Sequence, residues 1–99
     1  MALTYRIKAR AKREIETAAK WWAENRLDAP GAVRKDVADA LNILVEQPDI
    51  GTKVETGRSP QVRRFLLDRT KCFLYYRVRR AELEVLSIWH SSREHGPKV

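Results

Sequence analysis

Hydrophobic residues follow two different periods along the chain, and the change comes near Gly51. Residues 3–8 alternate apolar and polar side chains, which predicts a short half-buried strand. Over residues 9–25 the apolar side chains recur at helical spacing, and a second such stripe runs to about Glu46. The break between the two stripes contains Asp28, which we expect to be the N-cap of the second helix. Helices joined by so short a loop should lie antiparallel.

Beyond Gly51 the helical period disappears, and short runs of β-branched and aromatic residues alternate with turn-like segments. These runs predict three strands of an antiparallel meander, at residues 62–67, 72–78 and 83–89, and a weak fourth strand at 52–55. The predicted fold class is α+β, with an N-terminal strand and an antiparallel helical hairpin packed on a small twisted antiparallel β-sheet. Residues 91–99 have no periodicity, and we expect them to form a flexible tail.

The composition favours one small cytoplasmic domain that spans residues 1–99. A length of 99 residues with 43% hydrophobic side chains supplies one modest core. No apolar run approaches the roughly 18 residues that span a bilayer, so we expect no membrane association. The single cysteine cannot form an intramolecular disulfide, and no metal-ligand spacing occurs. We therefore predict a reducing compartment and neither a metal nor another cofactor.

The net charge of +7 is concentrated in the second half of the chain. Residues 50–99 hold 11 Lys and Arg against 5 Asp and Glu, a balance of +6, whereas residues 1–49 hold 9 against 8, a balance of +1. This asymmetry indicates an anionic partner, either nucleic acid or an acidic protein segment. A solvated basic face that only confers solubility is the alternative.

Three arginines in and after the first long strand are candidates for binding that partner. The strand period sends Arg64 to one side of the sheet and Arg63 and Arg69 to the other. A guanidinium group is suited to this role because it holds a carboxylate or a phosphate by two parallel hydrogen bonds. The alternative is a structural salt bridge to one of three nearby acids: Asp68, Glu82 or Glu84.

The last strand ends in a segment with mixed chemistry, in which Trp89 and His90 precede two serines and Arg93. We expect His90, Arg93 and an arginine of the earlier strand to line one basic groove that binds phosphate. A histidine in such a groove is also a candidate proton donor for RNA cleavage. The absence of a second proton-transfer partner makes this catalytic interpretation the weaker one.

Aromatic residues and the cysteine divide between core and surface. Trp21 and Trp22 are neighbours in a helix, so they point about 100° apart and do not both face the sheet. One of them is left at the surface, where it either contacts a protein or covers the edge of the hairpin. Tyr75 and Tyr76 point to opposite faces of a strand, and one of them should be core. Cys72 is expected to be a buried apolar filler.

The order of these segments, from about residue 3 to residue 97, resembles the ParE/RelE superfamily of toxins from bacterial type II toxin–antitoxin systems, and most closely its ParE branch. The residues that carry the resemblance are Trp21-Trp22, Asp28-Ala29-Pro30, Gln47-Pro48-Asp49-Ile50-Gly51, Val62-Arg63-Arg64-Phe65-Leu66-Leu67, Tyr75-Tyr76-Arg77-Val78 and Val85-Leu86-Ser87-Ile88-Trp89-His90-Ser91-Ser92-Arg93.

The resemblance implies a toxin that a cognate ParD-like antitoxin neutralises by wrapping around it. ParE-branch toxins poison DNA gyrase and so block replication, whereas RelE-branch toxins cut mRNA on the ribosome. The residues expected to bind the target or the antitoxin are Arg58, Arg63, Arg64, Arg69, Trp89, His90, Arg93 and Trp21.

The alternative implied by the same resemblance is a ribosome-dependent endonuclease that uses Arg64, His90 and Arg93. The tail after residue 94 contains no tyrosine, and residues 51–60 offer only Lys53 and Arg58 as cations. These departures favour a gyrase inhibitor without catalytic residues. A module that binds its antitoxin and nothing else is a third interpretation.

Overall fold

The computed structural model describes residues 2–55, 61–92 and 97. The order of elements is β1 (Thr4–Ile7), α1 (Ala9–Asn25), α2 (Ala32–Leu44), the short 3-10 helix η1 (Pro48–Ile50), β2 (Thr52–Lys53), β3 (Arg63–Leu67), β4 (Cys72–Arg79) and β5 (Glu82–His90). Every strand and helix expected from the periodicity is present. The expected tail lies largely outside the described residues.

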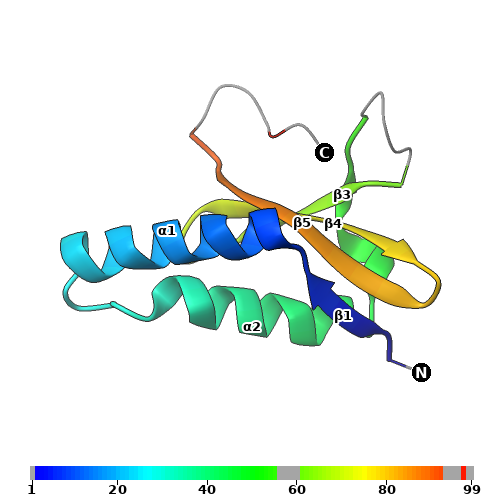
Figure 1. Ribbon diagram of the computed structural model, residues 1–99, viewed down its shortest axis with the longest axis horizontal. Coiled ribbons are helices and arrows are strands. Elements are labelled where there is room, and N and C mark those ends of the chain that lie inside the picture. The colour runs from blue at the N-terminus through cyan, green and yellow to red at the C-terminus, as the bar shows by residue number, and fades with distance from the viewer. Residues whose placement is uncertain (1, 56–60, 93–96, 98–99) are drawn as a thin grey trace.

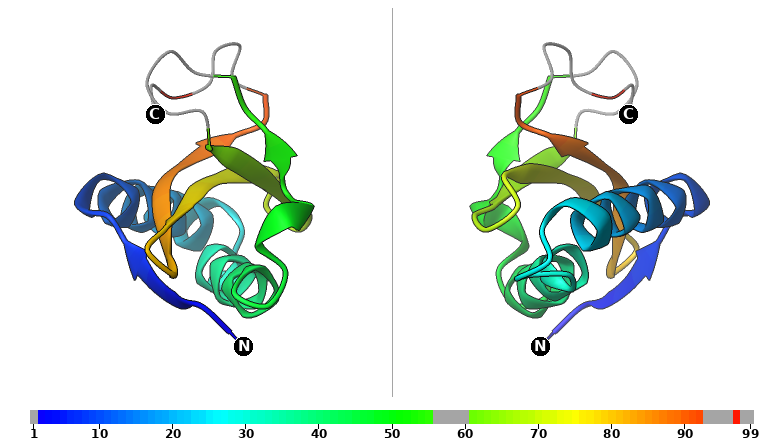
Figure 2. Two further views of the ribbon diagram at one scale, coloured as in Figure 1. Left: turned by 90° about the vertical axis from the view of Figure 1, so that its right-hand side faces the viewer. Right: turned by 90° about the vertical axis from the view of Figure 1, so that its left-hand side faces the viewer.

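The two helices run side by side and cover one face of a five-stranded sheet (Figures 1 and 2). The strand order is β1-β5-β4-β3-β2, and the last four strands form the predicted antiparallel meander. β1 is parallel to β5, so the sheet is mixed rather than wholly antiparallel. The alternation within β1 indicates a strand but carries no information about its direction relative to a distant neighbour.

The second helix begins later than the sequence indicated, and Asp28 is not its N-cap. The Ala32 amide donates to the Ala29 carbonyl, so the turn continues to Gly31, which is the N-cap. No side-chain hydrogen bond caps either helix. Of the helices that the structure describes, none combines the length and the apolar character needed to cross a membrane.

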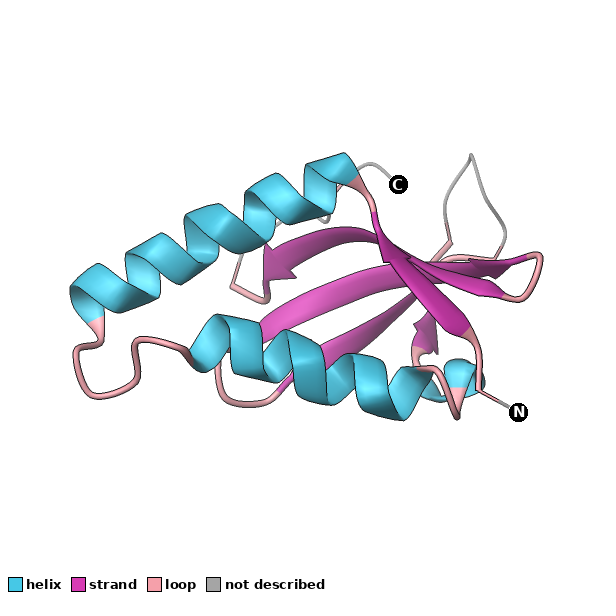
Figure 3. Cartoon of the chain, turned by 60° about the horizontal axis from the view of Figure 1, so that its bottom comes forward, coloured by secondary structure: helices cyan, strands magenta, loops and turns pink. Residues whose placement is uncertain are grey.

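The core lies between the helices and the facing side of the sheet (Figure 3). Its buried members are Ala11, Ile15 and Ala19 of α1, Val33, Val37, Ala40, Leu41 and Leu44 of α2, and Leu67, Cys72, Leu74, Tyr76, Leu83, Val85 and Ile88 of the sheet region. The predictions for Cys72 and the tyrosine pair are confirmed, because Tyr76 joins this core. Tyr75 is also buried, at 2% exposure, on the opposite side of the strand.

A β-bulge interrupts the register between β4 and β5. Tyr75 pairs with Ser87 and Tyr76 pairs with Val85, which leaves Leu86 as an extra residue in β5. The extra residue reverses which backbone groups of β5 point toward β4. This change determines which backbone amides and carbonyls at the end of β5 point away from β4.

Candidate functional site

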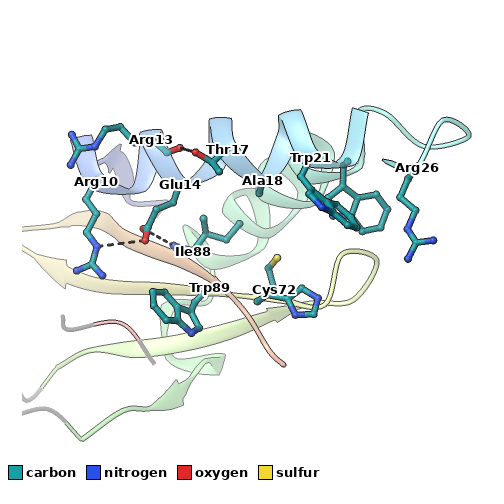
Figure 4. Close-up of a pocket in the computed structure, with 12 residues that line it drawn as sticks. Arg10, Arg13, Glu14, Thr17, Ala18, Trp21, Arg26, Cys72, Ile88 and Trp89 are labelled. Carbon is teal, nitrogen blue, oxygen red and sulfur yellow. Dashed lines mark hydrogen bonds and ion pairs between the residues drawn. The ribbon is translucent and has the colours of Figure 1, made fainter. Parts of the chain in front are cut away.

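A groove of about 820 Å³ lies between α1 and the end of β5 (Figure 4). Its lining consists of Arg10, Arg13, Glu14, Thr17, Ala18, Trp21, Trp22 and Arg26 at α1 and Cys72, Ile88, Trp89 and His90 of the sheet. Most of the exposed lining is apolar, and the cationic side chains come from α1 and the residue after it. Grooves that take the apolar face of an amphipathic peptide have apolar surface of this kind.

The helical repeat of α1 places the groove-lining residues on one face. Arg10, Glu14, Thr17 and Trp21 follow one another at spacings of three or four residues, so their side chains lie along one stripe. The buried stripe that begins at Ala11 faces the core beside it. One helix therefore packs against the sheet and also forms a wall of the groove.

The tryptophan pair and Arg26 form the end of this wall. The rings of Trp21 and Trp22 meet edge to face with centroids 6.1 Å apart. The Arg26 guanidinium lies 5.9 Å and 5.7 Å from the two centroids, within range of a cation–π interaction. Trp22 packs against the core, and Trp21 is 50% exposed. The prediction that only one tryptophan packs inward is confirmed, and Trp21 is left at the surface, where it lines the groove.

Glu14 connects the helix to the margin of the sheet. One of its carboxylate oxygens accepts hydrogen bonds from Ser87 Oγ at 2.7 Å and from the Ile88 amide at 3.3 Å. The other oxygen lies 3.6 Å from Nε of Arg10. A helix side chain thus occupies a position at which a neighbouring strand would normally pair with β5.

His90 is held in one orientation at the mouth of the groove. Its Nδ1 accepts the Ser92 amide hydrogen at 3.1 Å and lies 2.7 Å from Ser92 Oγ. A backbone amide can only donate, so the neutral ring carries its proton on Nε2. His90 pairs with Cys72 and therefore lies on the helix-covered face of the sheet.

The strand arginines do not converge on one cationic surface. Arg63 donates to the backbone carbonyls of Asp49 at 3.0 Å and Gly51 at 2.8 Å, so it holds the loop before β2. Arg69 lies 4.0 Å from the Asp36 carboxylate. Each of these two arginines faces an acid or a carbonyl from a segment that the fold brings alongside, so neither joins Arg64 in one binding surface. The salt-bridge alternative applies, but with different acids from those expected.

Arg64 points to the face of the sheet away from the helices. Its guanidinium lies 4.1 Å from the centroid of the Phe73 ring, which in turn meets Tyr75 edge to face. This face also carries Trp89, which pairs with Phe73. Arg64 and His90 consequently lie on opposite faces of the sheet. Arg58 and Arg93, the remaining predicted site residues, lie outside the described residues.

The fold also positions a tyrosine hydroxyl against the loop that precedes β2. The Tyr76 hydroxyl donates to the Pro48 carbonyl at 2.6 Å and accepts the Gly51 amide hydrogen at 3.1 Å. Burial raises the pKa of this phenol above its ordinary value, with smaller opposing effects from the Gly51 hydrogen bond and Arg63. A second hollow, of about 250 Å³, lies beside these groups. Because the hydroxyl is neutral and bonds to both Pro48 and Gly51, it fixes the loop before β2 to β4. We call these two hydrogen bonds the latch.

Sequence reasoning missed four groove residues, three on α1 and one directly after it: Arg10, Arg13, Glu14 and Arg26. Attention to net charge favoured the second half of the chain, whereas the groove arginines belong to the first. Their helical spacing, in register with Trp21, is the signal that identifies them. Among the described residues, no three His, Cys, Asp or Glu side chains gather as a metal site requires.

Comparison with known proteins identifies the family. The model of the family described as the ParE toxin of the type II toxin–antitoxin system, parDE, matches residues 5–95. Among solved structures, a chain of the chromosomal ParDE toxin–antitoxin system from P. aeruginosa is similar in fold, with a TM-score of 0.71 and 19% identity over 90% of this chain and 96% of that chain. No curated protein matches the sequence. Because the family model covers almost the whole chain, this chain belongs to the ParE toxin family.

Proposed function

We propose that this ParE toxin stops replication by binding DNA gyrase and that a cognate ParD-like antitoxin neutralises it. The observation that carries the proposal is the family match over residues 5–95, because gyrase inhibition is the typical action of ParE toxins. A toxin–antitoxin family implies an antitoxin partner for this chain. The identity of the target is the part that needs an experiment.

The arrangement of side chains supports action by binding. The endonuclease alternative requires Arg64 and His90 to approach one scissile phosphate, but they lie on opposite faces of the sheet. In addition, Nδ1 of His90 is engaged by the amide of Ser92. No observation on the described residues favours the mRNA endonuclease over gyrase inhibition.

We assign the two partners to two surfaces. The groove beside α1 joins apolar surface to Arg10, Arg13 and Arg26, which suits an acidic amphipathic antitoxin segment. The sheet face away from the helices carries Arg64 stacked on Phe73, and we assign the gyrase contact to this face. The two surfaces meet at Trp89, which lies on the Arg64 face and also lines the groove, so an antitoxin bound in the groove can obstruct the gyrase contact.

A supercoiling assay with purified gyrase tests the target. We expect micromolar toxin to inhibit supercoiling and an equimolar amount of the antitoxin to restore it. Unaffected supercoiling would overturn gyrase as the target. Mapping of mRNA ends in a translating extract separates the alternative, because an endonuclease of the RelE type would leave codon-phased cuts.

Charge reversal tests the assigned gyrase surface. Arg64→Glu should weaken gyrase inhibition at least tenfold, because it reverses the charge at the centre of the proposed contact. Lys12→Glu is the matched control, since it makes the same charge change at an exposed position of α1, on the helix-covered side of the sheet and outside the groove lining. Equal inhibition by both variants would show that the Arg64 face does not contact gyrase.

A further inference from the structure

In the part of the chain that the structure describes, only the first part of β5 has a strand on its outer margin. Within the described residues, β1 pairs with Glu82–Val85, and the Lys8 amide donates to the Val85 carbonyl at 3.0 Å. The chain then enters α1 at Ala9, while β5 continues to His90. The last residues of β5 therefore run past the end of their neighbouring strand.

The backbone groups of this free section point outward. The Ser91 amide donates to Lys71 at the β4 side, so alternate residues of β5 face the other way. The Ile88 amide confirms this direction, because it donates to Glu14 on α1. By the same alternation, His90 presents its amide and carbonyl to the outer margin. Ile88 and His90 thus provide two adjacent pairing positions for another strand.

The Glu14 carboxylate is a replaceable cap on this margin. It accepts the Ile88 amide at 3.3 Å, longer than a typical strand hydrogen bond, and its side chain is 25% exposed. Proteins protect unpaired sheet edges from unwanted association with charged side chains of this kind. A carbonyl from an added strand would satisfy the Ile88 amide equally well, and the carboxylate would keep its shorter hydrogen bond from Ser87 Oγ and its contact with Arg10.

The groove also has the shape that an added strand needs. Ile88 and His90 belong to the helix-covered face, whereas Trp89 belongs to the opposite face, and all three line the same groove. A hollow lined from both faces accommodates a chain whose alternate side chains point to the two sides. The α1 wall supplies aromatic surface at Trp21 and positive charge at Arg13, visible in Figure 4.

We propose that an extended, acidic segment of the antitoxin adds to the outer margin of β5 as a further β-strand and displaces the Glu14 carboxylate from Ile88. The occupant should alternate apolar residues with Asp or Glu, because the groove combines apolar walls with Arg10, Arg13 and Arg26. This inference rests on the proposed antitoxin partnership and goes further, since it specifies backbone pairing at Ile88 and His90.

Solution NMR of the complete toxin–antitoxin complex tests the pairing. With the toxin labelled by ¹⁵N and both chains by ¹³C, we expect a scalar coupling across a hydrogen bond from the Ile88 or His90 nitrogen to an antitoxin carbonyl carbon. The same amides should exchange with solvent at least 100-fold more slowly than in the free toxin. A complex that forms without these signals overturns strand addition and leaves antitoxin binding standing. Failure to form any complex overturns both proposals.

Variants of the cap provide the second test. Glu14→Ala should accelerate exchange of the Ile88 amide in the free toxin and tighten antitoxin binding about threefold to tenfold, because the competing acceptor is gone. Glu14→Gln, which retains an acceptor oxygen, should fall between this variant and the wild type. Glu16→Ala is the matched control, since Glu16 lies on the same helix but bonds to Arg34 of α2. Weaker binding by a folded Glu14→Ala variant would mean that Glu14 contacts the antitoxin, which overturns its displacement.

Discussion

At the β2 margin of the sheet, the buried Tyr76 and the partly buried Arg63 hold the backbone, whereas at the end of β5 the side chain of Glu14 covers it. The loop before β2 receives hydrogen bonds from Tyr76 and Arg63 at distances between 2.6 and 3.0 Å. At the margin of β5 after Val85, Glu14 accepts the Ile88 amide hydrogen at 3.3 Å and the Ser87 hydroxyl hydrogen at 2.7 Å. The first arrangement makes a rigid boundary, and the second leaves a boundary that a partner can occupy. Both edges require protection, but only the second is suited to binding.

Substitution of Gly51 should have the largest effect on the β2 margin. A Cβ at this position would lie 2.4 Å from the Tyr76 hydroxyl and 2.9 Å from the Arg64 carbonyl, and the carbonyl is backbone. Gly51→Ala should therefore lower the free energy of unfolding by about 2 kcal/mol or more, with a fall in melting temperature of roughly 10 °C. Chemical denaturation measures the change.

Gly31→Ala is the matched control for this substitution, because no atom lies within 4 Å of a Cβ built there. We expect the control to change the stability by less than about 1 kcal/mol. Similar losses at both glycines would show that the close approach to Tyr76 does not lock the β2 margin.

Removal of one hydroxyl should produce the next largest effect. Tyr76→Phe leaves the Gly51 amide and the Pro48 carbonyl without the oxygen that joins them. We expect a loss of about 1–2 kcal/mol in the free energy of unfolding, since buried polar groups are costly to leave unpaired. Thermal unfolding measures it, and Tyr5→Phe serves as a control at an exposed tyrosine. An unchanged melting temperature in both variants would contradict the latch.

The half of the β5 margin that β1 closes should respond to pH. The hydrogen bond from Arg77 Nε at 2.7 Å, aided by the charges of Arg77 and Lys8, holds the pKa of Glu84 below its ordinary 4.5 despite partial desolvation. A carboxylate with a depressed pKa stabilises the fold above its unfolded pKa and loses that contribution as pH falls through the folded pKa. The stability difference between wild type and Glu84→Gln should consequently shrink as pH falls from 7 to about 3.

Urea unfolding across this pH range measures the Glu84 effect. Glu24→Gln, an exposed change on α1, is the control and should leave the pH dependence of the wild type intact. A stability difference between wild type and Glu84→Gln that stays constant with pH would mean that the ion pair does not contribute through the charge of Glu84.

The smallest effect on stability is expected in the groove. Trp21 is 50% exposed, so Trp21→Ala should alter the free energy of unfolding by less than about 1 kcal/mol. The same change should weaken antitoxin binding at least tenfold, because a pre-positioned tryptophan is a typical binding hot spot. Calorimetric titration measures the affinity. Leu27→Ala, at a residue 81% exposed outside the groove lining, should bind as the wild type does.

Local pattern predicted most of the fold because each element buries one face at its own period. The helix over Ala9–Asn25 and the strands after Gly51 follow directly from that rule. The start of α2 was predicted wrongly because the N-cap position depends on how the Ala29–Gly31 turn closes. The residue types in this turn are compatible with more than one start of the helix. The candidate site was predicted only in part, since Trp21, Trp89 and His90 line the groove but Arg63 and Arg69 do not.

The sequence by itself determined the helices, the strands, the faces that they bury and the family resemblance, because these depend on neighbours within a few residues. Only the tertiary structure decided which group each charged side chain contacts. Arg63 and Arg64 are adjacent in the chain, yet one holds the Asp49 loop and the other stacks on Phe73 at the opposite face. Likewise, nothing in the local sequence distinguishes Glu14 from another helical glutamate. It bonds to the Ile88 amide because β1 pairs with β5 only as far as Val85 and leaves that amide beside α1. Contacts between residues more than 70 positions apart arise from the packing of whole elements, and no local period encodes them.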